Sequence, residues 1–152
     1  MHDETSKELR TTLTSAGKLE LSIVTVPMPE PREGEVLLKV EASPINPSDL
    51  GLLLGPADVS SLSITGSGDN TVASMDVPEA MMPAMQARLD AALPVGNEGA
   101  GVVIAAGAGA EHLVGQTIGV AGGAMYSQYR CVPAASCIVM NEGTTPRSEE
   151  HT

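Results

Sequence analysis

The stretch Pro94-Val95-Gly96-Asn97-Glu98-Gly99-Ala100-Gly101-Val102-Val103 places glycines on both sides of one carboxylate and follows them with an apolar, β-branched run. Glycine allows a tight turn or the close approach of another group, and such an apolar run is typical of a buried strand. We therefore predict a turn over Gly96–Gly101 and a strand over Val102–Ala106. Glu98 then either holds the turn or belongs to a site, and the residues alone favour the structural role.

The composition is that of one globular domain with a real core. The chain has 152 residues, of which 42% are hydrophobic, and it has no Phe or Trp, so its core must be built from Leu, Val, Ile, Ala and Met. The formal net charge of −11 argues against nucleic acid or an anionic membrane surface as a partner. No apolar run is long enough to span a bilayer, and residues 1–8 are polar and acidic, unlike a signal peptide. We therefore expect the protein to be cytoplasmic. We also expect residues 1–8 to form a disordered leader.

Alternating apolar and polar residues predict a mainly β fold with short helices. The segments Leu9–Thr14 and Leu19–Val26 are predicted to form a hairpin, and Glu35–Ala42 has the clearest strand pattern, with one face open to water. Three further short strands are expected in the last third of the chain: one that follows a turn within 113–120, one over 125–132 and one over 138–140. Many short strands separated by glycine turns favour a closed or half-closed β-barrel over a parallel sheet.

Two short helices and one long loop are expected between these strands. Asn46 is placed to cap a helix that begins at Pro47 and ends before Gly55, which puts Asn46 and Asp49 on one side of the turn. A second helix is predicted over Pro83–Ala92, and its methionines, at helical spacing, indicate core packing rather than a ligand groove. Residues 57–78 lose all periodicity and predict a long, flexible surface loop.

The sequence contains no motif of a nucleotide or metal site. Its glycine pairs lack the third glycine of a dinucleotide fingerprint, and none opens a convincing helix. Cys131 and Cys137 are six residues apart, which is not a zinc-ligand spacing, and none of the three histidines has a metal-ligand partner nearby in sequence. We predict no metal site and two free, mostly buried thiols.

The order of several motifs carries more information than any one of them. The motifs are Leu19-Glu20-Leu21, Val26-Pro27-Met28-Pro29-Glu30-Pro31, Gly34–Val40, Ile45-Asn46-Pro47-Ser48-Asp49, Gly96–Val103 and Gly122–Tyr129. Together they resemble the N-terminal, GroES-like catalytic domain of the medium-chain dehydrogenase/reductase superfamily. The resemblance covers residues 9–146 and implies a partly open β-barrel.

Departures from the zinc-dependent members of that superfamily are informative. Those enzymes place a Cys shortly before the Asp of the first helix and a Gly-His-Glu in the central turn. Here the corresponding residues are Asn46-Pro47-Ser48-Asp49 and Gly96-Asn97-Glu98, and residues 57–78 hold no Cys for a structural zinc lobe. The resemblance therefore implies the zinc-independent, quinone-oxidoreductase-like branch. Its members use NADPH or NADH to deliver hydride to a quinone, an enone or a similar activated double bond.

The resemblance also implies roles for individual residues. Asn46 and Asp49 would line the cleft near the nicotinamide, which makes both candidate catalytic residues and Asn46 a cofactor contact in a full-length protein. The turn Gly96, Asn97, Glu98 and Gly99 matches the Gly-Asn-Glu-Gly turn of enoyl-thioester reductases. That alternative is weakened because their catalytic Tyr has no counterpart between Leu50 and Ser61. Whether Glu98 has a chemical role stays open.

A dehydrogenase of this superfamily binds its cofactor with a Rossmann domain, which would begin near Thr152. Residues 147–152 do not continue the expected helix and look like translated sequencing adapter. We hypothesise that the sequence is a truncated reading of a longer protein. That protein would be a homodimer and would act on a small-molecule substrate. This fragment would then bind no nicotinamide cofactor and be inactive alone. The alternative is a stand-alone GroES-like binding or assembly module.

Overall fold

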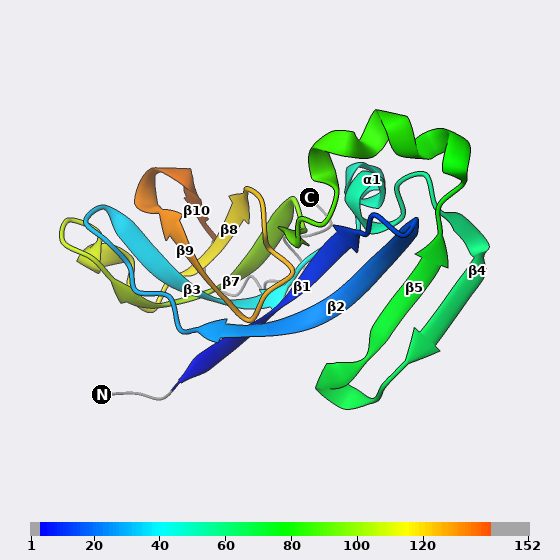
Figure 1. Ribbon diagram of the computed structural model, residues 1–152. Helices are drawn as coiled ribbons and strands as arrows, with labels where there is room; N and C mark the ends of the chain where they lie inside the picture. The colour runs from blue at the N-terminus through cyan, green and yellow to red at the C-terminus, as the bar shows by residue number, and fades with distance from the viewer. Residues whose placement is uncertain (1–3, 141–152) are drawn as a thin grey trace. The chain divides into compact units, whose positions relative to one another are not determined.

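The computed structural model describes residues 4–140, which form two compact units. The first unit holds residues 4–8, 25–45 and 96–140, and the second holds residues 9–24 and 46–95. The fold is mainly β with short helices, as predicted, and its two sheets have five strands each (Figure 1). Neither strand order returns to its first strand in the described part of the chain, so neither sheet closes into a barrel.

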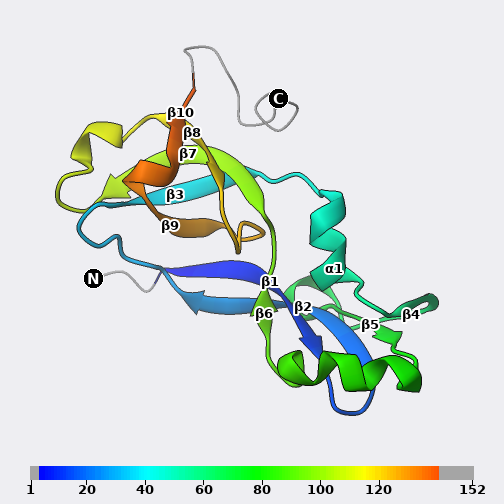
Figure 2. The same cartoon turned by 90° about the horizontal axis from the view of Figure 1, so that it is seen from above.

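The sheet of the first unit has the strand order β10-β8-β7-β3-β9, and Figure 2 shows its strands in that order. Its strands are antiparallel and comprise β3 (Glu35–Ala42), β7 (Glu98–Ala106), β8 (Thr117–Ala121), β9 (Tyr129–Pro133) and β10 (Cys137–Val139). The short 3-10 helices η4 (Glu111–Leu113) and η5 (Ala134–Ser136) connect these strands. The bounds predicted for β3 are confirmed.

Two predicted boundaries in this sheet are wrong. β7 begins at Glu98 rather than Val102, because the glycine-rich residues before Val102 pair with β8 from Glu98↔Ala121 onward. The predicted turn is therefore confined to Gly96 and Asn97. β9 begins at Tyr129 rather than Met125.

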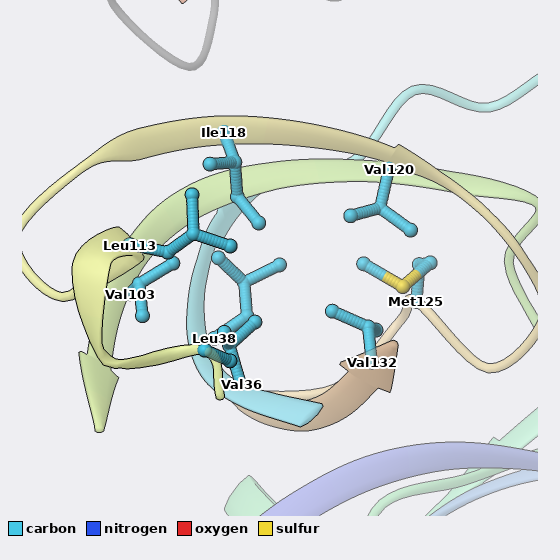
Figure 3. Close-up of a cluster of buried hydrophobic side chains, with 9 residues drawn as sticks. Val36, Leu38, Val103, Leu113, Ile118, Val120, Met125 and Val132 are labelled. Carbon is cyan, nitrogen blue, oxygen red and sulfur yellow. The ribbon is translucent and has the colours of Figure 1, made fainter. Parts of the chain in front are cut away.

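Aliphatic side chains and one methionine fill the core of the first unit. Figure 3 shows them pointing toward one another from the surrounding strands. Strands β3, β7, β8 and β9 supply most of them, and the buried members are Val36, Leu38, Val103, Ala110, Leu113, Ile118, Val120, Met125 and Val132. The prediction of a core without large aromatic residues is confirmed here.

Two glycines let backbone segments of the first unit approach closely. A Cβ atom at Gly101 would lie 1.9 Å from the carbonyl oxygen of Lys39 on β3, and one at Gly107 would lie 1.9 Å from that of Arg32. Neither distance is possible for a real side chain, so these positions require glycine. Gly101 and Gly107, which belong to glycine pairs in the sequence, therefore serve close backbone packing.

The other sheet has the order β4-β5-β2-β1-β6. Its strands are β1 (Thr5–Leu13), β2 (Lys18–Pro27), β4 (Asp58–Thr65), β5 (Val72–Asp76) and β6 (Leu93–Pro94). The predicted hairpin of β1 and β2 is confirmed. The leader predicted over residues 1–8 is wrong for Thr5–Glu8, where β1 has begun and Ser6 is buried. Residues 1–3 and the tail predicted over 147–152 lie outside the described residues.

The long loop predicted over residues 57–78 is wrong. In Figure 1, β4 and β5 run side by side as an antiparallel hairpin, with the short helix η2 (Gly68–Asn70) between them. β5 continues the ladder onto β2, from Lys18↔Asp76 to Ser22↔Val72. β4 has little burial on either face, so its sequence shows no alternation of apolar and polar residues that would predict a strand. The hairpin forms because β5 pairs with β2 and β4 pairs with β5.

The helices of the second unit are short. The 3-10 helix η1 (Pro47–Asp49) leads directly into α1 (Leu50–Leu53), which confirms the first predicted helix. The second predicted helix is instead a 3-10 helix, η3 (Glu79–Arg88), with Pro83 in its interior. Met82 and Met85 do pack on a core, as predicted, together with Leu89 against Leu13, Leu19, Met75 and Val77. No helix within residues 4–140 has both the length and the hydrophobicity needed to cross a bilayer.

Candidate functional site

Asn46 and Asp49 lie together at the start of η1, as the sequence predicted. The Asn46 backbone N–H donates to Asp49 Oδ2 at 2.8 Å, and the Asp49 N–H donates to the Asn46 carbonyl oxygen at 2.9 Å. The two residues form a capping box, in which Asp49 is 3% exposed. The Asp49 carboxylate therefore fixes the backbone of Asn46, whose own side chain is half-buried.

A polar contact inside the second unit anchors the helix that follows this turn. Thr11 on β1 donates its hydroxyl to the Leu52 carbonyl oxygen at 2.8 Å. The Arg88 guanidinium lies 3.4 Å from Thr11 Oγ1 and 3.5 Å from the same Leu52 oxygen, and burial lowers its pKa. Together these groups satisfy a carbonyl of α1 and hold the helix that carries the Asn46–Asp49 turn.

The turn at Gly96 and Asn97 belongs to the first unit. Gly96 is buried with φ +106, and a Cβ atom there would lie 2.6 Å from the Tyr126 backbone nitrogen. Only glycine fits both the backbone conformation and the space. The Gly96 and Asn97 carbonyl oxygens accept hydrogen bonds from the N–H groups of Met125 (3.1 Å) and Gly122 (2.7 Å).

The segment 122–127 packs across this turn and onto the chain that follows β3. The Ser43 hydroxyl donates to the Met125 carbonyl oxygen at 2.9 Å, and the Tyr126 hydroxyl donates to the Pro44 carbonyl oxygen at 2.8 Å. A Cβ atom at Gly99 would meet Met125 Cε at 2.6 Å. The turn is therefore locked by its neighbours, while the side chains of Asn97 and Glu98 are exposed.

The sequence predicted some of these residues and missed others. The structure brings Asn46 and Asp49 together in the second unit and places Gly96, Asn97, Glu98 and Gly99 in the first. Sequence reasoning missed the residues that hold them, namely Thr11, Arg88, Ser43 and Tyr126. Tyr126 and Ser43 each bond a group 82 residues away, so no local pattern could have revealed those contacts.

The described residues include neither a metal centre nor a typical phosphate-binding turn. No cluster of three or more His, Cys, Asp or Glu side chains within residues 4–140 could hold a metal ion. None of the glycine turns there opens a helix suited to a pyrophosphate, and Gly101 and Gly107 are used for backbone packing. The described residues therefore do not fit the phosphates of a dinucleotide.

The two cysteines are free thiols, as predicted, although half-buried rather than mostly buried. Burial raises the pKa of both thiols, and for Cys131 the Glu35 carboxylate adds to the rise. A raised pKa leaves less thiolate at neutral pH, which is the reactive form. Neither thiol therefore has the electrostatic environment of a nucleophile.

Comparison with known sequences gives one short match. No family model matches the chain. The "zinc-type alcohol dehydrogenase-like protein C337.11" of Schizosaccharomyces pombe is 56% identical over 34 residues, which are 22% of this chain and 10% of that protein.

Comparison with solved structures matches nearly the whole chain. JamJ enoyl reductase aligns with TM-score 0.63 and 17% identity over 97% of this chain and 38% of its own. The mycobacterial protein Rv1454c, solved with NADPH, gives TM-score 0.60 and 20% identity over 97% and 36%. The quinone oxidoreductase of Coxiella burnetii gives 0.59 and 18% over 94% and 39%. The chain thus has the fold of one part of oxidoreductases of the quinone oxidoreductase and alcohol dehydrogenase type, and spans less than half of their length.

Proposed function

We propose that this chain is the substrate-side part of a longer NAD(P)H-dependent, zinc-independent reductase that transfers hydride to a quinone, an enone or a similar activated double bond. The observation that carries the proposal is the match of nearly the whole chain to between 36% and 39% of Rv1454c, the Coxiella quinone oxidoreductase and JamJ enoyl reductase. The solved complex of one of them with NADPH supports the nicotinamide cofactor. NADH is the alternative.

The proposed division of labour follows from the residues. A nucleotide-binding domain outside the described residues would hold the cofactor, because no glycine turn in residues 4–140 opens a long helix of the kind that binds a pyrophosphate. Asn46 would contact the nicotinamide and the substrate from its capped turn. Asp49 would act as a positioning residue through its 2.8 Å bond to the Asn46 backbone.

The donor set supports the zinc-independent branch. The turn offers Asn97 and Glu98, and zinc sites in proteins are built mainly from Cys, His and carboxylates in sets of three or four. Ser48 occupies the stretch in which zinc-dependent relatives carry a Cys. Without zinc, polarisation of the acceptor must come from hydrogen-bond donors, for which the amide of Asn46 is suited. The name of the yeast relative contains the word zinc, but that name describes the yeast protein and not this chain.

A second candidate is an enoyl-thioester reductase. The structural match to JamJ enoyl reductase and the Gly96–Gly99 turn favour it. Both candidates deliver hydride to an activated acceptor, and they differ only in the group that activates it. A homodimer and a cytoplasmic location stay predictions for the longer protein.

The experiment uses the protein extended by the residues that its gene encodes after codon 152. Oxidation of NADPH and NADH is followed with a quinone, an enone, an enoyl thioester and a simple alcohol, with and without a chelator. We expect turnover with the quinone or the enone that the chelator does not change. Turnover only with the alcohol, or its loss on chelation, would contradict the proposal, as would a genuine stop codon after Thr152.

Replacement of Asn46 tests the assigned role in the same protein. Asn46→Ala is expected to lower kcat/KM by about a hundredfold, the typical effect of removing one donor that stabilises developing charge. Asn70→Ala is the matched control, because Asn70 is exposed in η2 on the hairpin of β4 and β5. If both variants keep the wild-type kcat/KM, Asn46 has no part in the reaction.

A further inference from the structure

The second unit has an open cavity between η3 and the turn that joins β1 to β2. Figure 2 shows the green helix η3 beside this turn. The cavity has a volume of about 580 Å³, and small-molecule sites typically measure about 300–1,000 Å³. Every residue that lines it belongs to the second unit, and none belongs to the Asn46 turn. The cavity is therefore separate from the residues to which the proposed reductase function assigns roles.

The walls of the cavity are held by hydrogen bonds at both ends of η3. Before the helix, the Val77 N–H donates to the Gly17 carbonyl oxygen at 2.9 Å, and after it the Asp90 N–H donates to the Leu13 carbonyl oxygen at 2.8 Å. The Asp90 carboxylate also accepts a 3.0 Å bond from the Ser15 N–H. Asp90 has φ 59, which is uncommon for a residue other than glycine, and these bonds hold it in that conformation. The cavity is thus formed before any ligand binds.

One part of the cavity wall is apolar. Val77 is buried, whereas Met82 and Leu89 are half-buried. All three belong to the hydrophobic cluster of the second unit and also line the cavity. The flexible side chain of methionine adapts to partners of different shape. This wall therefore offers an apolar contact to the hydrocarbon part of a ligand.

The charged side chains that line the cavity leave one negative charge uncompensated. They are Lys18, Asp76 and Glu79. Lys18 and Asp76 are paired residues in the ladder of β2 and β5, and their side chains form an ion pair. Within residues 4–140, the Glu79 carboxylate has neither a hydrogen bond nor an ion pair. A ligand of this cavity should therefore carry a cation that can donate to Glu79.

The uncompensated carboxylate lies next to the apolar wall. Glu79 and Met82 are three residues apart on η3, and residues at this spacing on a 3-10 helix lie one above the other on the same face. An ammonium group carries three N–H donors and no acceptor, so it is complementary to a carboxylate. An anionic ligand would instead be repelled by Glu79 and by the net charge of −11.

We propose that this cavity binds a small amphipathic amine, with its ammonium group on Glu79 and its apolar body against Met82 and Leu89. The site goes beyond the proposed reductase function and does not depend on it. Binding can be measured without a nicotinamide cofactor, so the failure of either proposal leaves the other untouched.

Titration of the ¹⁵N-labelled 152-residue chain tests the site by nuclear magnetic resonance. The probes are n-hexylamine, which is protonated at pH 7, and hexan-1-ol and hexanoate as neutral and anionic molecules of the same length. We expect hexylamine to give saturable shifts of the backbone N–H signals that surround the cavity, in residues 15–18, 76–82 and 86–89. Hexan-1-ol should bind more weakly, and hexanoate should give no shifts there. Equal binding of the amine and the alcohol, or amine-dependent shifts only in other residues, would overturn the proposal.

Replacement of Glu79 tests the assigned contact. Glu79→Gln keeps the size of the side chain and removes its charge, so the Kd for hexylamine should rise by about fivefold, the upper range for an exposed ion pair. The Kd for hexan-1-ol should not change. Glu30→Gln is the matched control, because Glu30 is exposed in the first unit and does not line the cavity. Circular dichroism shows that both variants keep the fold. If the two variants bind hexylamine equally well, Glu79 does not hold the ammonium group and the proposal is wrong.

Discussion

Gly101→Ala is expected to lower the free energy of unfolding by about 3 kcal/mol or more, at or beyond the upper end of what overpacking costs. The new Cβ atom would lie 1.9 Å from the Lys39 carbonyl oxygen, which belongs to the neighbouring interior strand β3. Backbone cannot rotate away as a flexible side chain can. Either β3 and β7 separate or the variant fails to fold.

Gly123→Ala is the control for that substitution. A Cβ atom at Gly123 would meet no atom within 4 Å, and its backbone is not in the left-handed region. We expect a change within about 0.5 kcal/mol, as for most surface substitutions. Urea denaturation followed by circular dichroism measures both variants. Equal stability of the two would show that β3 and β7 do not approach as closely as the structure places them.

Ile118→Ala is expected to cost about 2–4 kcal/mol, because it removes buried methylene groups and leaves a cavity. Ile118 on β8 is fully buried, and Val36 and Leu38 of β3 belong to the same cluster (Figure 3). The core has no large aromatic side chain that could shift to refill the space.

Ile138→Ala provides the comparison for this truncation. The residue is the same, it lies on the neighbouring strand β10 opposite Gly119, and it is 61% exposed. Its loss should change stability by less than about 1 kcal/mol. If denaturation gave the same free energy of unfolding for Ile118→Ala and Ile138→Ala, the assignment of the core to the inner face of this sheet would be contradicted.

Sequence patterns predicted the elements whose side chains alternate or whose termini carry capping residues. β3 alternates around a buried face, and its bounds were predicted correctly. Asn46 and Pro47 predicted the start of the first helix because one caps and the other begins it. The hairpin of β4 and β5 could not be predicted in this way, because β4 is mostly exposed and β5 is held in its ladder by pairing with β2.

The candidate site shows the same contrast between local sequence patterns, which could be predicted, and long-range contacts, which could not. The spacing of Asn46 and Asp49 was enough to predict that they share a turn, and their hydrogen bond confirms it. The contacts that hold the two turns join residues far apart in the chain, such as Thr11 with Leu52 and Tyr126 with Pro44. Glycines were ambiguous in sequence for a related reason: the same residue serves a turn at Gly96 and a close strand contact at Gly101.

Equilibrium titration with NADPH tests the central claim most directly. The cofactor is added to the 152-residue chain and, in parallel, to the protein extended through the residues encoded downstream, and binding is followed by nicotinamide fluorescence. The account predicts saturable micromolar binding by the extended protein and no saturable binding by the 152-residue chain, because no glycine turn in residues 4–140 opens a long helix of the kind that binds a pyrophosphate. Saturable micromolar binding by the 152-residue chain alone would contradict it.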